Sequence, residues 1–265
     1  MKFEPEATRN QSWFKNVLQT IAFFGGYLVF AVLGSLASIV CAIPSLVFRG
    51  ARSRRFGQEL IHGLFRFFVG YLRLFGLVEL DASALADLRN QGGMIVVANH
   101  PCLLDAVLVV SQLPRVVCLM KGSLARNIVL SGTSRLAGYI HNRSSFGLVK
   151  TCGQRLGEGS NLLIFPEGTR TVGPNPLPFK RGFALVAVLT RSPVQTVIVT
   201  ANSPYLGKGW PFLKKPSFPL RYVLRPGKRF EPAPETDVED FGGMIENYFL
   251  ETLAGPSLAS SAKRT

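Results

Sequence analysis

The chain has 265 residues, which is enough for one large domain or for one domain with an appendage. It is 47% hydrophobic, and its 30 Lys and Arg against 16 Asp and Glu give a formal net charge of +14. A basic and apolar chain favours an anionic membrane surface as partner, and nucleic acid is disfavoured because there is no zinc-finger spacing, RNP-like strand or heptad array.

The cysteine pattern argues against a disulfide framework. The four cysteines are widely spaced and form no Cys-x-x-Cys pair: Cys41, Cys102, Cys118 and Cys152. Such usage is typical of reduced, buried thiols in a cytosol-facing protein. Cys102 would need a depressed pKa to act as a nucleophile. No group of His, Cys and Asp has metal-ligand spacing, so no metal site is expected.

An apolar segment without any charged residue runs from Val17 to Phe48. A helix needs about 20 such residues to cross a bilayer, and the segment is too long and starts too late for a typical signal peptide. One tilted span fits, and so does a re-entrant hairpin with a bend at Gly25–Gly26 or Gly34. The remaining alternative is a buried helix of a soluble core. Flanking positive charge slightly favours a cytoplasmic C-terminal side.

A basic amphipathic segment follows, over residues 53–80. The stretch from Arg49 to Arg73 contains six Arg and one acid, set among Phe and Leu residues. This pattern is typical of a helix at a membrane surface, where each cation contributes about 1 kcal/mol next to an anionic leaflet. The alternative is an ordinary core-facing helix with a solvated basic face.

From Leu77 onward, short strands and helices alternate. We expect strands at 94–98, 115–120, 161–165, 194–200 and 221–224. We expect helices at 104–112, 123–136, 147–157, 179–190 and 238–253. This alternation predicts an α/β fold with a mostly parallel sheet flanked by helices.

The domain organisation follows from the sequence patterns of these segments. Residues 1–76 are predicted to form N-terminal membrane-associated helices, 77–253 an α/β domain, and 254–265 a disordered tail. Residues 203–219 are rich in Pro, Gly and aromatic residues, and they predict a long loop that covers the site or touches the membrane.

One histidine lies directly after an apolar run. The run Met94–Ala98 predicts a buried strand, and His100 follows it, five residues before Asp105. An Asp in the first turn of the next helix can accept a hydrogen bond from one ring nitrogen, fix the tautomer and leave the other nitrogen as a general base. The alternative is that His100 caps a turn and Asp105 merely opens a helix.

A second motif follows another apolar strand. After Leu162–Phe165 come residues 166–170, with the sequence Pro-Glu-Gly-Thr-Arg. Gly168 lets the backbone approach a ligand closely, Thr169 offers a hydroxyl and an amide, and Arg170 offers a planar fork suited to phosphate. Taken alone, this sequence also fits an ordinary turn. Both motifs follow strands of a parallel sheet, so both are expected on the rim where ligands bind.

Together, in this order, the two motifs resemble the glycerolphosphate and lysophospholipid acyltransferase family. The best-known bacterial members of that family make phosphatidic acid from lysophosphatidic acid. The resemblance spans roughly residues 50–230 and includes Phe179–Gly182, which matches the segment after the family's third block. The hydrophobic N-terminus is similar in style to the membrane-dipping helices of bacterial members.

The resemblance implies acyl transfer from a thioester, on coenzyme A or acyl carrier protein, to a hydroxyl. His100 is then the general base, and Asp105 orients it and stabilises the imidazolium. Glu167 either fixes the second motif or binds an acceptor hydroxyl. Backbone amides around Gly168 are candidate donors to the carbonyl oxygen. The resemblance implies no cofactor besides the thioester co-substrate and no metal.

The resemblance also implies cations at an anionic acceptor head group. These are Arg170, Lys121 after a predicted strand, and Arg143 at the end of a run similar to the family's second block. For each cation the alternative is a solvated surface charge. The pattern departs from the family at His141–Asn142, where an acidic residue commonly precedes the Arg, and at Thr196, where the fourth block has Pro. These departures leave the acceptor open.

Three readings of the activity therefore remain. The first is a membrane-bound acyltransferase for a lysophospholipid, with its active site on the cytoplasmic face of a bacterial-type inner membrane. The second uses a lyso-aminolipid of the ornithine or glycine type, or another specialised lipid, as acceptor. The third is a non-catalytic membrane-binding homologue. A serine hydrolase is disfavoured because there is no Gly-x-Ser-x-Gly, and a P-loop enzyme because there is no Gly-Lys-Ser/Thr.

Overall fold

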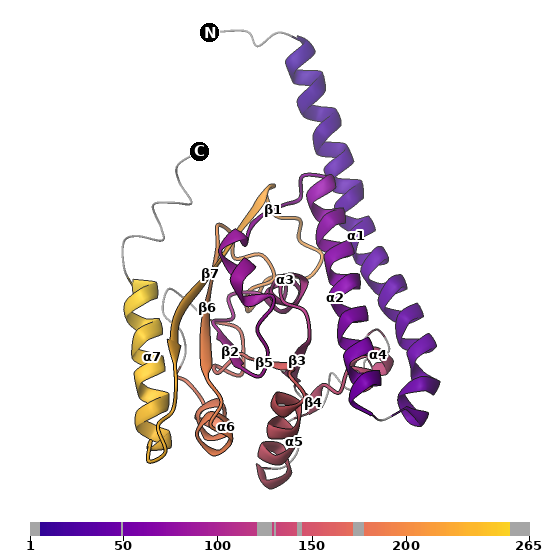
Figure 1. Cartoon of the computed structure of the whole chain (residues 1–265). Coiled ribbons are helices and arrows are strands. Elements are labelled where there is room, and N and C mark those ends of the chain that lie inside the picture. Colours follow the sequence, from indigo (N-terminus) through magenta and orange to yellow (C-terminus); the bar gives the residue numbers. More distant parts are fainter. Residues whose placement is uncertain are drawn as a thin grey trace.

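The computed structural model describes residues 6–48, 50–120, 129, 131–141, 145–171 and 178–254. Within these residues, seven strands form one sheet in the order β1-β7-β6-β2-β5-β3-β4 (Figure 1). The strands are β1 (Val78–Asp81), β2 (Ile95–Ala98), β3 (Val116–Met120), β4 (Ile140–His141), β5 (Asn161–Ile164), β6 (Val194–Ala201) and β7 (Leu220–Phe230). All neighbouring strands are parallel except β6 and β7, which run antiparallel. The predicted α/β fold with a mostly parallel sheet is confirmed.

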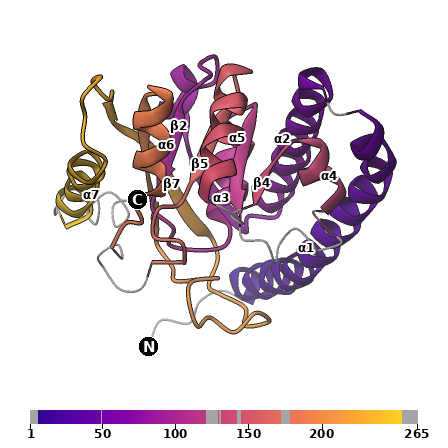
Figure 2. The same ribbon diagram turned by 90° about the horizontal axis from the view of Figure 1, so that it is seen from below.

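Helices cover both faces of the sheet (Figure 2). The α-helices are α1 (Glu6–Val47), α2 (Ala51–Leu74), α3 (Asp105–Gln112), α4 (Ser131–Leu136), α5 (Ser145–Gly157), α6 (Gly182–Thr190) and α7 (Val238–Ala254), and a 3-10 helix, η1, covers Ser83–Leu88. On one face α2 and α3 pack against the sheet, with α1 outside them; α5, α6 and α7 lie on the other face. The molecule is therefore layered, with a core on each side of the sheet.

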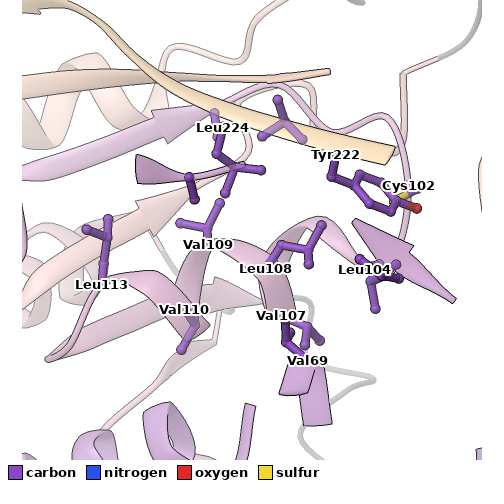
Figure 3. Packing of buried hydrophobic residues seen from close by; sticks show 14 of the residues in the cluster. Val69, Cys102, Leu104, Val107, Leu108, Val109, Val110, Leu113, Tyr222 and Leu224 are labelled. Carbon is purple, nitrogen blue, oxygen red and sulfur yellow. The ribbon is translucent and has the colours of Figure 1, made fainter. Parts of the chain in front are cut away.

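The central strand β2 supplies both cores. Ile95 and Val97 belong to the cluster beneath α5 and α6, whereas Val96 and Ala98 belong to the cluster beneath α3. Successive side chains of a strand point to opposite faces, so a strand covered on both sides is a continuous apolar run. Figure 3 shows the α3 side, where Leu108 and Val109 lie towards Tyr222 and Leu224 of β7, while Val107 lies beside Val69 of α2.

The N-terminal apolar segment is one unbroken helix. Of the two arrangements expected for this segment, a hairpin that turns at Gly25–Gly26 or Gly34 is not formed, because the helix continues through these glycines. They bring α1 close to its neighbours instead: Gly25 faces Tyr71 of α2, and Gly34 faces Val129. The chain turns back only after Phe48, where α2 begins and runs antiparallel to α1 (Figure 1).

The outer side of α1 is not a buried core surface. Its exposed side chains include Ile21 at 66%, Val40 at 72% and Ile43 at 73% of their full accessible area. The stretch Trp13–Val47 is long and apolar enough to cross a membrane by length and composition. The alternative of a helix buried in a soluble core is thus contradicted.

Helix α2 combines the two expectations stated for it. Its inner face is buried against α1, α3 and α4, as the core-facing alternative predicted. Its outer face exposes Phe56, Phe67 and Leu74 beside arginines. The pair Arg54–Glu158 ties α2 to the end of α5, on the other face of the sheet. This connection fixes the helical layer to the body that carries the site.

Candidate active site

The site begins where β2 ends. Asn99 continues the β2–β6 ladder through its side chain, which donates from Nδ2 to the Val199 carbonyl (2.8 Å) and accepts from the Val199 N–H at Oδ1 (2.8 Å). This amide occupies the place of a backbone strand partner, so the main chain is free to leave the sheet at the next residue. His100 is therefore projected from a fixed point at the carboxyl end of the sheet, where ligands of such folds bind.

His100 and Asp105 meet, as the spacing suggested. Asp105 is the first residue of α3, and its Oδ2 lies 3.1 Å from His100 Nδ1. The His100 side chain is 17% exposed and the Asp105 side chain is fully buried. Within the described residues His100 Nε2 has no hydrogen-bond partner. With Nδ1–H donated to the carboxylate, Nε2 carries a lone pair and can accept a proton.

Two further contacts fix the imidazole. The Phe165 ring stacks on it, with centroids 4.2 Å apart and planes 23° apart. The backbone on either side is also held, because the His100 N–H donates to Glu167 Oε1 (3.1 Å) and its carbonyl accepts from the Thr171 N–H (2.8 Å). The two sequence motifs are thus joined by direct hydrogen bonds at the same rim.

Cys102 holds the carboxylate from the other side. Its N–H donates to Asp105 Oδ2 (2.7 Å) and its thiol donates to Oδ1 (2.9 Å). Burial raises the pKa of the Cys102 thiol well above its usual range, and the Asp105 charge adds to the shift. Cys102 is therefore a neutral donor, and the depressed pKa that a nucleophilic role would need is absent. All four cysteines are free thiols.

Burial also raises the pKa of Asp105, and hydrogen bonds from His100 and Cys102 pull it back down. A buried carboxylate is stable as an anion only when such donors replace the lost water. The net direction for the Asp105 pKa is upward, and the hydrogen bonds from His100 and Cys102 limit that rise.

The second motif forms a tight turn after β5. Gly168 has φ +66°, and its N–H donates to the Phe165 carbonyl (3.0 Å), so this amide is already engaged and is not available to a substrate oxygen. Glu167 is 4% exposed and accepts from Thr171 Oγ1 (2.7 Å) as well as from the His100 N–H. Of the two roles expected for Glu167, these contacts favour fixing the motif.

The structure places the predicted cations differently from one another. Arg170 donates from Nη1 to the carbonyls of Leu206 (2.9 Å) and Gly207 (2.8 Å), so one end of its guanidinium holds a loop. Lys121 and Arg143 lie outside the described residues. The Thr169 side chain is half-buried, and its hydroxyl has no hydrogen bond within the described part of the chain.

Sequence reasoning missed one cation, Lys180. A Cβ added at Gly168 would lie 2.9 Å from Lys180 Nζ, so the ammonium sits over the turn of the second motif. The neighbouring Arg181 is instead paired with Glu239 and Glu246. The resemblance of Phe179–Gly182 to the family was the available signal, but only the fold shows which of the two cations faces the motif.

The described residues contain no group of His, Cys, Asp and Glu that could hold a metal ion. What they bring together is a base with a free nitrogen, a buried carboxylate behind it, and two cations on the same rim. Such a set can take a proton from a hydroxyl and bind an anionic group beside it.

Parts of the chain are similar to known acyltransferases. The Acyltransferase family model matches residues 80–200. A 1-acyl-sn-glycerol-3-phosphate acyltransferase of Helicobacter pylori is 29% identical over 117 residues, covering 42% of this chain and 49% of that protein. The human 1-acyl-sn-glycerol-3-phosphate acyltransferase alpha is 25% identical over 204 residues, covering 71% of this chain and 64% of that protein.

The chain thus spans about half the length of the Helicobacter relative and less than two thirds of the human one. Among solved structures, the crystal structure of the 1-acyl-sn-glycerophosphate (LPA) acyltransferase PlsC from Thermotoga maritima is similar, with a TM-score of 0.66 and 19% identity. The similarity covers 96% of this chain and 98% of that one. At this identity the likeness concerns the fold.

Proposed function

We propose that the chain is a member of the glycerolphosphate acyltransferase family and that it transfers a fatty acyl group from a thioester to the hydroxyl of a lysophospholipid such as lysophosphatidic acid. The donor is acyl-acyl carrier protein or acyl-coenzyme A. The observation that carries the proposal is the His100–Asp105 hydrogen bond, which leaves His100 Nε2 free on the rim beside the Glu-Gly-Thr-Arg turn.

The proposed reaction uses no enzyme nucleophile. The acceptor hydroxyl gives its proton to His100 Nε2 while its oxygen attacks the thioester carbonyl carbon. The buried Asp105 carboxylate stabilises the imidazolium that forms. The tetrahedral intermediate then collapses, the carbon–sulfur bond breaks, and the imidazolium returns the proton to the leaving thiolate. The products are an ester and a free thiol.

The acceptor's charge is assigned to the cations of the rim. Arg170 holds the loop through two hydrogen bonds from Nη1, which leaves its other guanidinium nitrogens for the acceptor, and Lys180 lies over the same turn. A guanidinium and an ammonium beside the same turn suit a phosphate monoester. Lys121 and Arg143 are kept as further proposed contacts on the strength of the family resemblance.

The proposed location is a bacterial-type inner membrane, with the site on the cytoplasmic side. Its support is the exposed apolar side of α1 together with the arginines of α2. A protein that acts on lipids gains from being held where its acceptor is concentrated.

The test is transfer of a labelled acyl chain from acyl-acyl carrier protein or acyl-coenzyme A to lysophosphatidic acid in detergent. We expect turnover by the wild type and a loss of at least about a thousandfold in His100→Ala, because the alcohol then lacks its base. The variant should keep the wild-type circular dichroism spectrum.

Substantial residual turnover in His100→Ala would remove His100 from the role of base. An inactive wild type would leave the fold in place and direct the search to lyso-aminolipid acceptors with the same donors. Inactivity with every such acceptor would favour a non-catalytic membrane-binding homologue.

A further inference from the structure

The loop between β6 and β7 is attached to the candidate site at its base. Arg170 Nη1 donates to the carbonyls of Leu206 and Gly207, and the Leu103 N–H donates to the Leu206 carbonyl (3.2 Å). Arg170 belongs to the second motif and Leu103 to the first. The start of this loop is therefore fixed to both motifs at once.

Further along, the same loop lies against α1. Tyr27 donates its hydroxyl to the Phe212 carbonyl (2.7 Å), and the two rings have centroids 4.6 Å apart. Lys215 Nζ donates to Asn16 Oδ1 (2.7 Å) and to Thr20 Oγ1 (2.6 Å). The loop thus extends the surface of α1 towards the site.

The tip of the loop is a turn that presents two apolar side chains to solvent. The Lys214 N–H donates to the Pro211 carbonyl (2.9 Å), which places Phe212 and Leu213 at the centre of a β-turn. These two side chains are 58% and 67% exposed. The Trp210 indole N–H donates to the Lys214 carbonyl (3.0 Å), and Lys214 Nζ lies 5.1 Å from the Trp210 ring. The exposed pair is held in place by its own neighbours.

The charge around this turn has a single sign. The lysines of residues 203–219 are Lys208, Lys214 and Lys215, and the segment contains no acidic residue. The nearby part of α1 is apolar and exposed at Ile21, Phe24 and Leu28. Exposed apolar side chains bordered by Lys and Trp are the composition of an interfacial membrane contact.

We propose that the Phe212–Leu213 turn is a second membrane-contact element, which inserts into the headgroup region of an anionic lipid monolayer beside α1. The partner is the lipid surface itself, because the apolar tip, the lysines and the continuity with the apolar side of α1 all match it. Since the base of the loop is hydrogen-bonded to both motifs, this contact places the rim next to the membrane. It specifies where a membrane-embedded acceptor approaches, and to that extent it rests on the proposed function.

The first experiment does not depend on activity. A polarity-sensitive fluorophore is attached at Leu213→Cys and, as a matched control, at Leu189→Cys. Leu189 is an exposed leucine (61%) on α6, across the sheet from α1. Wild type carried through the same labelling sets the background from the four native cysteines. Full-length protein is added to vesicles of phosphatidylcholine and phosphatidylglycerol, and vesicle flotation measures binding.

We expect a blue shift and quenching by lipid-borne quenchers at position 213 and not at 189. A probe at 213 that stays in an aqueous environment while the protein floats with the vesicles would overturn the proposal. Absence of any flotation would overturn it as well. Neither result bears on whether the protein transfers acyl groups.

The second experiment uses charge insertion. Leu213→Asp is compared with Leu189→Asp, using acceptor embedded in the same vesicles and a short-chain acceptor that is monodisperse in buffer. We expect Leu213→Asp to raise the apparent KM for the vesicle acceptor roughly tenfold. This corresponds to the membrane-binding free energy lost when one large apolar side chain no longer inserts into the lipid. With the monodisperse acceptor it should match the wild type. If Leu213→Asp had the same kinetics as the wild type with both acceptors, the proposal would be contradicted. If Leu213→Asp lost turnover with both acceptors, the substitution would have damaged the site, and this result would also count against the proposal.

Discussion

At the scale of the residue, the least expected feature of the site is the thiol that faces the dyad carboxylate. Asp105 is completely buried, and its identified partners are His100 and Cys102. Cys102 contributes one hydrogen bond from its backbone and one from its side chain. Tyr222 lies behind the thiol, with its hydroxyl 3.7 Å from Sγ. The pKa of Asp105 is therefore lowered by Cys102 as well as by its dyad partner His100.

Substitution of Cys102 should change the pH dependence of turnover. The thiol's hydrogen bond lowers the pKa of Asp105, so Cys102→Ala raises that pKa. Because the dyad needs an ionised Asp105, the acid side of the kcat profile should move to higher pH in Cys102→Ala. At pH values above that limb, kcat should return towards the wild-type value. A pH–rate profile in detergent measures this.

Cys102→Ser is the matched control, because it restores a donor of similar size. We expect its acid limb to lie near that of the wild type. If Ala and Ser variants had the same profile, the thiol would be a packing residue only. A pH-independent fall in kcat in Cys102→Ala would lead to the same conclusion.

The sequence predicted the dyad but not its support. The spacing of His100 and Asp105, between a strand and a helix, was enough to predict that their side chains meet. The role of the Cys102 thiol depends on the rotation of the turn between them, which is not encoded in any periodic pattern. Lys180 was missed for a similar reason, since it is distant from Gly168 in sequence and reaches it only because of the turn after β5.

At the scale of the element, α4 packs unusually close to α1. A Cβ added at Gly132 would lie 1.8 Å from the Ser38 carbonyl oxygen, and the Ser38 hydroxyl donates to the Val129 carbonyl (2.9 Å). A backbone atom cannot move aside as a flexible side chain can. The contact between these helices thus requires a residue without a side chain at position 132.

Gly132→Ala should destabilise the protein by about 1–3 kcal/mol, because the helices must separate to admit the methyl group. Gly147→Ala is the control in α5, where nothing lies within 4 Å of the added Cβ. It should stabilise by up to about 1 kcal/mol, since Ala favours an exposed helix more than Gly does. Thermal midpoints in the same detergent should therefore move in opposite directions. Equal midpoints for the two variants would show that α1 and α4 can move apart to admit the methyl group at little cost in stability.

The bounds of a strand could be predicted from the sequence where the strand is buried, because a buried strand is a continuous apolar run. The apolar runs at β2, β3, β5 and β6 gave strands whose bounds agree with the structure to within a residue or so. The edge strands β1 and β4 are short and half-exposed and have no such run, so they were missed. The sequence left open whether the first apolar segment is one span or a hairpin that turns at its glycines, and the structure shows one helix in which Gly25 and Gly34 lie in close contacts. Helix α6 begins at Gly182, later than expected, because Phe179 and Lys180 are still part of the turn that returns to Pro166.

At the scale of the whole molecule, the distribution of charge is uneven. Arg52, Arg55, Arg66 and Arg73 are all exposed on α2, and their spacing places them along one side of that helix. Exposed Phe56, Phe67 and Leu74 follow the adjacent side. The net charge of +14 is therefore partly concentrated where the protein offers apolar side chains.

Replacing Arg52 and Arg55 by Gln should weaken binding to anionic vesicles by about 1 kcal/mol per cation, or roughly fivefold each. Binding to vesicles of phosphatidylcholine alone should change little. Flotation at increasing salt measures the effect, and the wild type should lose affinity more steeply than the variant. Arg191→Gln, at the exposed C-terminal end of α6, is the control and should bind as the wild type does. A similar loss in this control would indicate a general effect of net charge.

The pairing of β1 with β7 also bears on how the protein is made. Val78 pairs with Leu220, and the Leu220 N–H donates to the Leu77 carbonyl. The first strand of the sheet therefore cannot pair until the last strand has been synthesised. On a ribosome, α1 and α2 emerge long before that partner exists. The apolar side of α1 is thus free to contact a bilayer while β1 is still unpaired. Under the proposed membrane association, α1 would reach the lipid surface before the strand that completes the sheet is made.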